Sequence, residues 1–184
     1  MNISNNRIQN IVTSANLGTE IDLNSLALNL SEAEYEPQSF PGLILRQKST
    51  KTTALIFHSG KIVCTGAKTL EQVKSSVEAV VKSLNDAGIS IPGTPSYEVQ
   101  NIVASSDLGQ PIDLTSVVLS LGLERVEYEP EVFPGLVYRM NDPKVVFLLF
   151  GSGRLVCVGA RKIHDVEVSI DKLKEELRAA DLMH

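Results

Sequence analysis

The stretch Glu127-Tyr-Glu-Pro-Glu-Val-Phe-Pro-Gly-Leu-Val-Tyr-Arg139 decides the fold, because the chain contains it twice. The other copy lies 93 residues earlier and reads Glu34-Tyr-Glu-Pro-Gln-Ser-Phe-Pro-Gly-Leu-Ile-Leu-Arg46, with nine of the 13 positions identical. Internal repetition on this scale predicts that one structural unit is built twice from the same chain.

The repeat extends to both sides of this stretch. Residues 9–23 match residues 100–114 at 10 of 15 positions, and residues 60–68 match residues 153–161 at 5 of 9 positions. Between the two copies, proline and glycine mark residues 88–95 as a connection. The sequence therefore predicts two domains, residues 1–92 and 93–184, each holding one repeat.

Both repeats show the same succession of local patterns. In the first repeat they predict strands over residues 8–14, 43–47, 53–58 and 61–65, the last two joined by a hairpin turn at Ser59-Gly60. Asp22 or Asn24 is a candidate N-cap for a short helix, and Asp113 is its counterpart in the second repeat. A long helix closes each repeat, with one apolar stripe made of Leu70, Val73, Val77, Val80 and Leu84, or of Ile163, Val166, Ile170, Leu173 and Leu177. Such helices pack on one face of a sheet, which predicts an α+β fold.

The predicted strands are apolar on both faces. In residues 61–65, Ile62 and Cys64 form one face, but Val63 on the other face is apolar as well. A sheet with one solvated face should instead alternate apolar and polar residues. Only one long helix per repeat is available as a cover, so the second apolar face is either a binding surface or is covered by another layer, for example after dimerisation. The residues alone leave these two interpretations open.

Composition excludes several functional classes. The net charge of −5 comes from the second half, because residues 1–92 carry eight basic and eight acidic side chains and residues 93–184 carry nine and 14. The net charge therefore argues against nucleic-acid binding, and a nucleic-acid-binding function would have to rest on something other than bulk charge. No run of 18 apolar residues indicates a membrane span. There is no nucleophile with its base and no glycine-rich phosphate loop, so we expect neither an enzyme nor a cofactor.

The two cysteines, Cys64 and Cys157, occupy equivalent positions in apolar strand patterns. Neither has a histidine or cysteine beside it, so no metal site is expected. We predict buried, reduced thiols, which fits an intracellular compartment.

Several unusual motifs occur in order and twice: Gln9-Asn-Ile-Val12, Glu34-Tyr-Glu-Pro37, Phe40-Pro-Gly42, Leu55-Ile-Phe57 and Gly60-Lys-Ile-Val-Cys-Thr-Gly-Ala-Lys68. With their second copies, they make the chain closely resemble the TATA-box-binding protein family from residue 8 to about residue 180. The resemblance implies one curved antiparallel sheet, shaped like a saddle, with helices on the convex face and DNA on the concave face. This family is itself a standard example of minor-groove binding with apolar wedges, so that mechanism comes with the resemblance.

The resemblance also implies roles for individual residues, by match of motif. Central hydrogen bonds to minor-groove acceptors would come from Asn10 and Asn101. Base edges and sugars would be contacted by Val12, Val63, Val103 and Val156, and Thr65 would add a hydroxyl there. The DNA-binding face would also include Leu55, Leu148 and Val158. Val158 departs from the hydroxyl residue found in many relatives. The wedge pairs would be Phe40 with Phe57 and Phe133 with Phe150. Phosphates would be met by Arg46, Ser59, Lys61, Lys68, Arg139, Ser152, Arg154 and Arg161.

The implied function is that of a general transcription initiation factor, which binds and bends TATA-like promoter DNA and nucleates a preinitiation complex. A·T pairs present only acceptors in the minor groove, whereas G·C pairs add the guanine amino group, so an apolar, donor-poor face favours A·T pairs. The alternative is a scaffold that binds a protein or a small ligand on the same apolar face. A gel shift with A·T-rich and G·C-rich duplexes separates the two.

The resemblance implies protein partners as well. Glu129, Glu131 and Val132 match the loop that docks a transcription factor IIB-type protein, and RNA polymerase would be reached only indirectly. No membrane partner is expected, and a homodimer of the free protein stays open. The acidic composition and short N-terminus resemble archaeal members, which predicts a cytoplasmic, nucleoid-associated protein, or a nuclear one if the source is eukaryotic.

Overall fold

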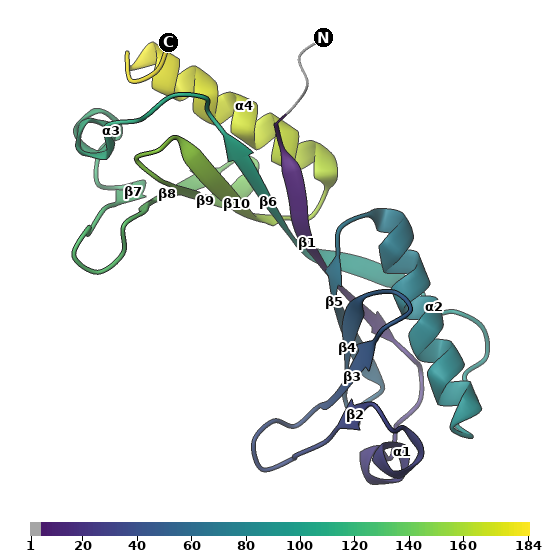
Figure 1. Cartoon of the computed structure of the whole chain (residues 1–184). Coiled ribbons are helices and arrows are strands. Elements are labelled where there is room, and N and C mark those ends of the chain that lie inside the picture. The colour runs from purple at the N-terminus through teal and green to yellow at the C-terminus, as the bar shows by residue number, and fades with distance from the viewer. Residues whose placement is uncertain (1–4) are drawn as a thin grey trace. The chain divides into compact units, whose positions relative to one another are not determined.

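The computed structural model describes residues 5–184, which form two compact units (Figure 1). One unit comprises residues 10–100, and the other joins residues 5–9 to residues 101–184. Each unit thus holds most of one repeat together with the start of the other repeat's first strand. The domain boundaries expected from the repeats, 1–92 and 93–184, stay a prediction.

The unit of residues 10–100 is an antiparallel sheet covered by helices. Its strands lie in the order β2 (Ala33–Glu34), β3 (Leu43–Gln47), β4 (Thr52–Ile56), β5 (Lys61–Ala67) and β1 (Arg7–Asn16). Its helices are α1 (Leu23–Asn29) and α2 (Leu70–Asp86). The predicted elements of the first repeat are therefore all present, and their bounds differ by a few residues at most.

The other unit repeats this arrangement. Its strands lie in the order β6 (Tyr97–Asp107), β10 (Arg154–Ala160), β9 (Lys144–Leu149), β8 (Leu136–Asn141) and β7 (Val126–Glu127). Its helices are α3 (Leu114–Leu121) and α4 (Ile163–Ala179). Among residues 5–184, no helix combines the length and the hydropathy that a membrane span needs.

Side-chain caps fix where the short helices begin. The carboxylate of Asp22 accepts a hydrogen bond from the Ser25 amide, and Asp113 accepts one from the Ser116 amide, so Asp22 rather than Asn24 is the N-cap. On α2 the predicted stripe is buried except for Leu70, which is 49% exposed. Leu70 is the first residue of the helix, and helical side chains lean toward the N-terminus, so its side chain extends past the end of the packed stripe.

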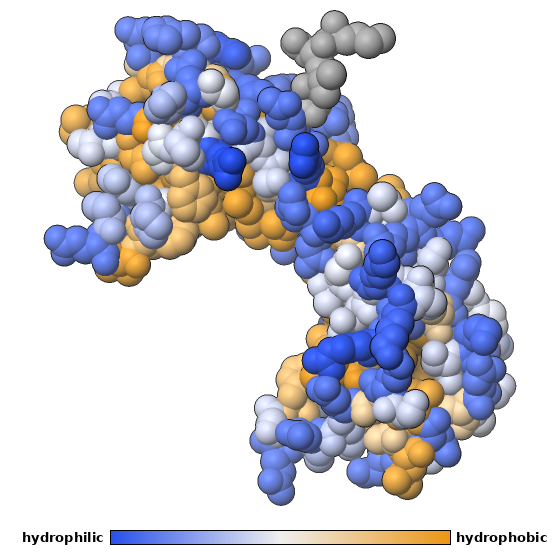
Figure 2. Space-filling view, in the orientation of Figure 1, coloured by the Kyte–Doolittle hydropathy of each residue, from blue (hydrophilic) through white to orange (hydrophobic). Residues whose placement is uncertain are grey.

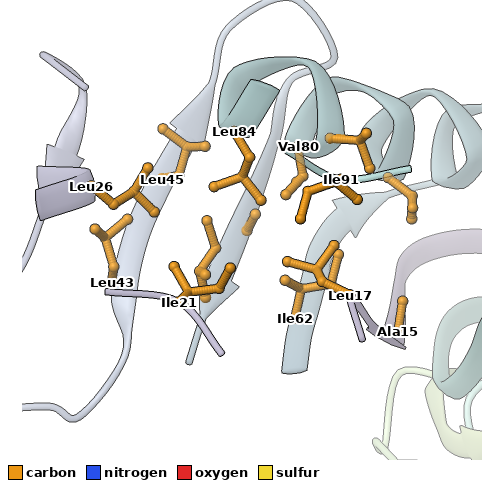
Figure 3. Packing of buried hydrophobic residues seen from close by; sticks show 14 of the residues in the cluster. Ala15, Leu17, Ile21, Leu26, Leu43, Leu45, Ile62, Val80, Leu84 and Ile91 are labelled. Carbon is orange, nitrogen blue, oxygen red and sulfur yellow. The ribbon is translucent and has the colours of Figure 1, made fainter. Parts of the chain in front are cut away.

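The core of each unit lies between its long helix and one face of its sheet. Figure 3 shows this packing for residues 10–100, where Val80 and Leu84 of α2 meet strand residues such as Leu45 and Ile62. Burying one such side chain contributes about 1.5–3 kcal/mol. In the other unit, Phe147 is fully buried and Tyr138 nearly so. This packing explains why one face of each sheet must be apolar.

Cys64 and Cys157 are buried and free, as predicted. Burial raises the pKa of both thiols, because it disfavours the thiolate. They act as small core side chains.

The turns of the β4–β5 hairpin and of the β9–β10 hairpin both require glycine. Gly60 and Gly153 have φ angles of 90° and 92°. A Cβ at Gly60 would lie 2.1 Å from the Thr19 carbonyl oxygen, and one at Gly153 would lie 2.0 Å from that of Gln110. Both the backbone conformation and the close approach therefore exclude a side chain.

Candidate nucleic-acid interface

The sheet face opposite the helices is apolar and partly exposed in both units. Along β5, buried Ile62 and Cys64 alternate with partly exposed Val63 and Thr65. Leu148 of β9 is likewise partly exposed between buried neighbours. In the unit that contains α4, Figure 2 shows hydrophobic surface gathered on the side away from that helix. The helices therefore leave this face uncovered.

Strand register aligns the predicted base-contacting residues into cross-strand rows. In the unit of residues 10–100, one row runs Ser14, Val63, Leu55 and Ile44. The matching row of the other unit runs Ser105, Val156, Leu148 and Val137. Each unit thus brings two of the predicted residues side by side on one apolar surface.

A second row in each unit is chemically different between the repeats. Thr65 pairs with Thr53, which pairs with Arg46. The equivalent row runs Val103, Val158, Val146 and Arg139. Val12 lies where a bulge interrupts the β1–β5 register, between Ile11, which pairs with Ala67, and Thr13, which pairs with Cys64. We call these two sets the threonine row (Thr53, Thr65) and the valine row (Val146, Val158).

Sequence reasoning missed four residues of this face, namely Ile44, Thr53, Val137 and Val146. All four are partly exposed and lie opposite predicted residues. The period-2 alternation of a strand could have identified them, because Ile44 and Arg46 must share a face.

Asn10 and Asn101 are both partly exposed and are held differently. The Gly66 amide donates to Asn10 Oδ1 at 2.7 Å, and Asn10 Nδ2 donates to Thr65 Oγ1 at 3.0 Å. The Gly159 amide donates to Asn101 Oδ1 at 2.7 Å. Within residues 5–184, Asn101 Nδ2 has no hydrogen-bond partner, since Val158 offers no acceptor where Thr65 does.

The predicted wedges are aromatic pairs. Phe40 packs edge-to-face on Phe57, and Phe133 on Phe150, with ring centroids 5.9 Å apart in both. Phe133 is 38% exposed, and the other three are partly exposed.

The glycine of each Phe-Pro-Gly motif makes room for its ring pair. A Cβ at Gly42 would lie 2.9 Å from Phe40 Cε1 and 3.0 Å from Phe57 Cε1. A Cβ at Gly135 would lie 2.7 Å from Phe133 Cε1 and 3.0 Å from Phe150 Cε1. The motif therefore places two large apolar groups close together at the end of each unit's sheet.

The predicted phosphate-contacting residues are all exposed, and several cations are paired with carboxylates. Arg46 pairs with Glu34, and Arg139 Nη1 lies 3.1 Å from Glu127 Oε1. Arg154 Nε lies 3.9 Å from Asp107 Oδ2. Ser59 and Ser152 accept from the amides of Lys61 and Arg154, which positions both hydroxyls in the hairpin turns. A phosphate would have to replace carboxylates at the three arginines, whereas Lys61, Lys68 and Arg161 have no ion pair in the described part of the chain.

Two equivalent cavities flank these turns and carry opposite charges at one position. A cavity of about 750 Å³ is lined by Arg7, Ser152 and Arg154, among others. Its counterpart of about 430 Å³ is lined by Ser59, Lys61 and Glu98. Glu98 is the repeat equivalent of Arg7. Sequence reasoning missed Arg7, which adds a cation to the edge that already holds Arg154.

The predicted partner loop is exposed. The amides of Val132 and Phe133 both donate to the Glu129 carbonyl at 2.9 Å, which closes the turn before the wedge. Glu129, Glu131 and Val132 are exposed, Val132 by 80%. Residues 5–184 contain no group of histidine, cysteine and carboxylate side chains that could hold a metal ion.

Comparison with known proteins agrees with this geometry. The family model described as "Transcription factor TFIID (or TATA-binding protein, TBP)" matches residues 5–87 and 96–180. The TATA-box-binding protein of Archaeoglobus fulgidus is 48% identical over 177 residues, which cover 96% of this chain and 97% of that protein. The protein of the same name from Picrophilus torridus is 50% identical over 176 residues, covering 96% of both chains.

A solved structure supports the fold directly. The structure of Methanococcus jannaschii TBP matches with a TM-score of 0.86 at 44% identity, covering 95% of this chain and 98% of that one. The fold class predicted from the sequence is thereby confirmed.

Proposed function

This chain belongs to the family of transcription factor TFIID, or TATA-binding protein, and on that premise we propose that it binds and bends TATA-like promoter DNA through the minor groove as a general transcription initiation factor. The family is one of non-enzymatic transcription factors. The observation that carries the proposal is the partly exposed apolar sheet face, present in both repeats and left uncovered by α2 and α4.

The chemistry of that face suits A·T pairs. Its rows consist mainly of valine, leucine and threonine, with Asn10 and Asn101 as the amide donors. A·T pairs offer acceptors in the minor groove, which these amides satisfy, and the guanine amino group of a G·C pair would meet apolar side chains. T-A steps also deform easily, so the sequence that fits chemically is inexpensive to bend.

Exposed cations supply the sequence-independent part of the affinity. Phosphate contacts fix position and register without reading bases, and they require only a local band of charge. Lys61, Lys68, Arg154 and Arg161 lie in or beside β5 and β10, the strands that carry Val63 and Val156. The net charge of −5 is therefore compatible with DNA binding.

A competition experiment tests the proposal against the scaffold alternative. We expect a gel shift with an A·T-rich duplex, a much weaker one with a G·C-rich duplex, and loss of the shift when an A·T-selective minor-groove drug is added. Inhibition by major-groove modification alone, or equal affinity for both duplexes, would favour the scaffold.

We also propose that Glu129, Glu131 and Val132 dock a transcription factor IIB-type protein, with RNA polymerase recruited indirectly on nucleoid DNA of an archaeal-type cell. The equivalent loop of the first repeat has Gln38 and Ser39 in place of Glu131 and Val132, so a partner can distinguish the two ends. Glu129→Lys/Glu131→Lys should weaken the ternary complex and leave DNA binding intact. The matched control is Glu36→Lys/Gln38→Lys, and equal loss of both complexes would contradict the assignment.

A further inference from the structure

The two repeats present different hydrogen-bonding surfaces to a base pair. In the threonine row, Thr53 and Thr65 lie directly opposite each other on β4 and β5, and both are partly exposed. In the valine row, Val146 and Val158 occupy the same positions on β9 and β10. Threonine and valine have nearly the same shape, so the difference between the rows is chemical.

The asparagines increase this difference. Thr65 Oγ1 accepts from Asn10 Nδ2 and lies 3.3 Å from Asn10 Oδ1, so its hydroxyl belongs to a small network that can both donate and accept. Asn101 Oδ1 is occupied by the Gly159 amide, while in residues 5–184 its Nδ2 has no partner. The second repeat therefore offers donors surrounded by methyl groups, and the first repeat offers donors and acceptors.

This difference matters for a G·C pair. The guanine amino group is the one donor in the minor groove, and it needs an acceptor once water is excluded. A threonine hydroxyl can accept from it, whereas a valine leaves it buried without a partner, which is unfavourable. The two rows therefore differ in whether their side chains can accept a hydrogen bond from the guanine amino group.

We propose that the threonine row tolerates a G·C pair and the valine row rejects it, so that a single G·C pair orients the protein on an otherwise A·T site with the first repeat over the G·C half. The inference rests on the proposed function, because it requires minor-groove binding. Thr53, Thr65, Val146 and Val158 are then the residues that determine polarity.

The test is an orientation measurement by energy transfer. The native cysteines are buried, so Leu28→Cys, at a side chain that is 87% exposed on α1, provides one reactive labelling site. The second dye is placed on one end of the duplex. Two duplexes carry one G·C pair in the left or the right half of a symmetric A·T site, and a third carries one in each half.

We expect the transfer efficiency to invert when the G·C pair moves between halves, and the duplex with two G·C pairs to bind about ten-fold or more weakly than either single one. The swapped variant Thr53→Val/Thr65→Val/Val146→Thr/Val158→Thr should invert both orientations. The variant Thr53→Val/Thr65→Val should lose both the orientation preference set by the G·C pair and the tolerance of a G·C pair.

Orientation that is independent of the G·C pair, or unchanged in the swapped variant, would overturn the inference. Thermal melts of the variants check folding, and Val146→Thr/Val158→Thr alone should bind the duplex with two G·C pairs more tightly. Failure of the parental protein to bind the all-A·T duplex would instead refute the proposed function.

Discussion

The ring of Phe133 packs edge-to-face on the ring of Phe150, with centroids 5.9 Å apart and an interplanar angle of 70°. Such pairs are worth about 0.5–1.5 kcal/mol beyond the area they bury, so each ring holds the other in place. Phe40 and Phe57 repeat the relationship at 5.9 Å and 69°. Each unit thus carries an apolar group that is ordered before any DNA arrives.

Replacing a wedge ring should affect DNA binding more than folding. Because Phe133 is 38% exposed and its ring pair is worth about 0.5–1.5 kcal/mol, Phe133→Ala should lower the melting temperature by only a few degrees. Affinity for an A·T duplex should fall about ten-fold or more, since stacking of an aromatic ring on a base is worth ~1–3 kcal/mol. A fluorescence-transfer bending assay should show a smaller bend. Phe147→Ala is the control: this ring is fully buried on β9, and its loss should cost ~3–5 kcal/mol of stability.

Gly135→Ala should displace the wedge without unfolding the protein. Its Cβ would lie 2.7 Å from Phe133 Cε1, so the ring must move, but the φ angle of Gly135 is not positive. We expect lower DNA affinity at a nearly unchanged melting temperature. Gly153→Ala should instead lower the melting temperature, because its Cβ would lie 2.0 Å from the backbone carbonyl oxygen of Gln110, which cannot move without the backbone. A drop in melting temperature for Gly135→Ala as large as for Gly153→Ala would show that the glycine supports the fold.

Arg7 and Glu98 should have opposite effects on salt dependence. Arg7→Gln removes a cation beside Arg154, and Glu98→Gln removes an anion beside Lys61. The slope of log K against log salt changes by about one for each phosphate that the protein neutralises. Arg7→Gln should make the slope shallower and lower the affinity, whereas Glu98→Gln should make the slope steeper and raise the affinity. Identical slopes for both variants and the parent would mean that neither residue acts on the DNA backbone.

Alkaline pH should reveal the environment of Tyr138. Burial, followed by its hydrogen bond to Glu176, raises the pKa of Tyr138 to about 12. The unfolded chain releases this proton near pH ~10 while the folded protein retains it, so this contribution to stability is complete below pH ~10 and is lost as pH rises to about 12. Urea denaturation between pH 9 and 12 should show a steeper loss for the parent than for Tyr138→Phe. Parallel curves would mean that the hydroxyl titrates equally in both states.

The sequence predicted the helices and strands well because their signals are local and repeated, as in the helix stripe at Val73, Val77 and Val80. The ring pairs came from the family resemblance, and the structure shows that the rings contact each other, whereas their role as wedges stays a prediction. The exposure of Leu70 was missed because Leu70 is the first residue of α2 and its side chain extends past the packed stripe, which the spacing of apolar residues does not show.

The hydrogen bonds and ion pairs within the candidate interface could not be predicted from the sequence, because they join residues that are distant in the chain. The Asn10–Thr65 hydrogen bond joins residues 55 positions apart, and its absence at Asn101 follows from the valine at position 158 and from the bulged registers of β1–β5 and β6–β10. The ion pairs at Arg46 and Arg139 likewise depend on cross-strand neighbours rather than on sequence neighbours. DNA binding by the apolar face stays a prediction, whereas the structure shows that this face lies opposite the helices.

The placement of Gln9 with residues 101–184 has a consequence for the order of folding. Gln9 Nε2 donates to Ser105 Oγ at 2.8 Å, and Ser106 Oγ donates to Asn6 Oδ1 at 2.6 Å, which closes loops of about a hundred residues. The unit of residues 10–100 has all its parts once Gln100 has been synthesised, whereas the other unit needs residues 6–9 as well as residues 101–184. Because contacts so distant in sequence slow folding, we expect the unit that contains residues 101–184 to be completed last. We therefore expect the unit of residues 10–100 to fold first during synthesis, while the hydrogen bonds of Asn6 and Gln9 with residues 105 and 106 form only after those residues have been made.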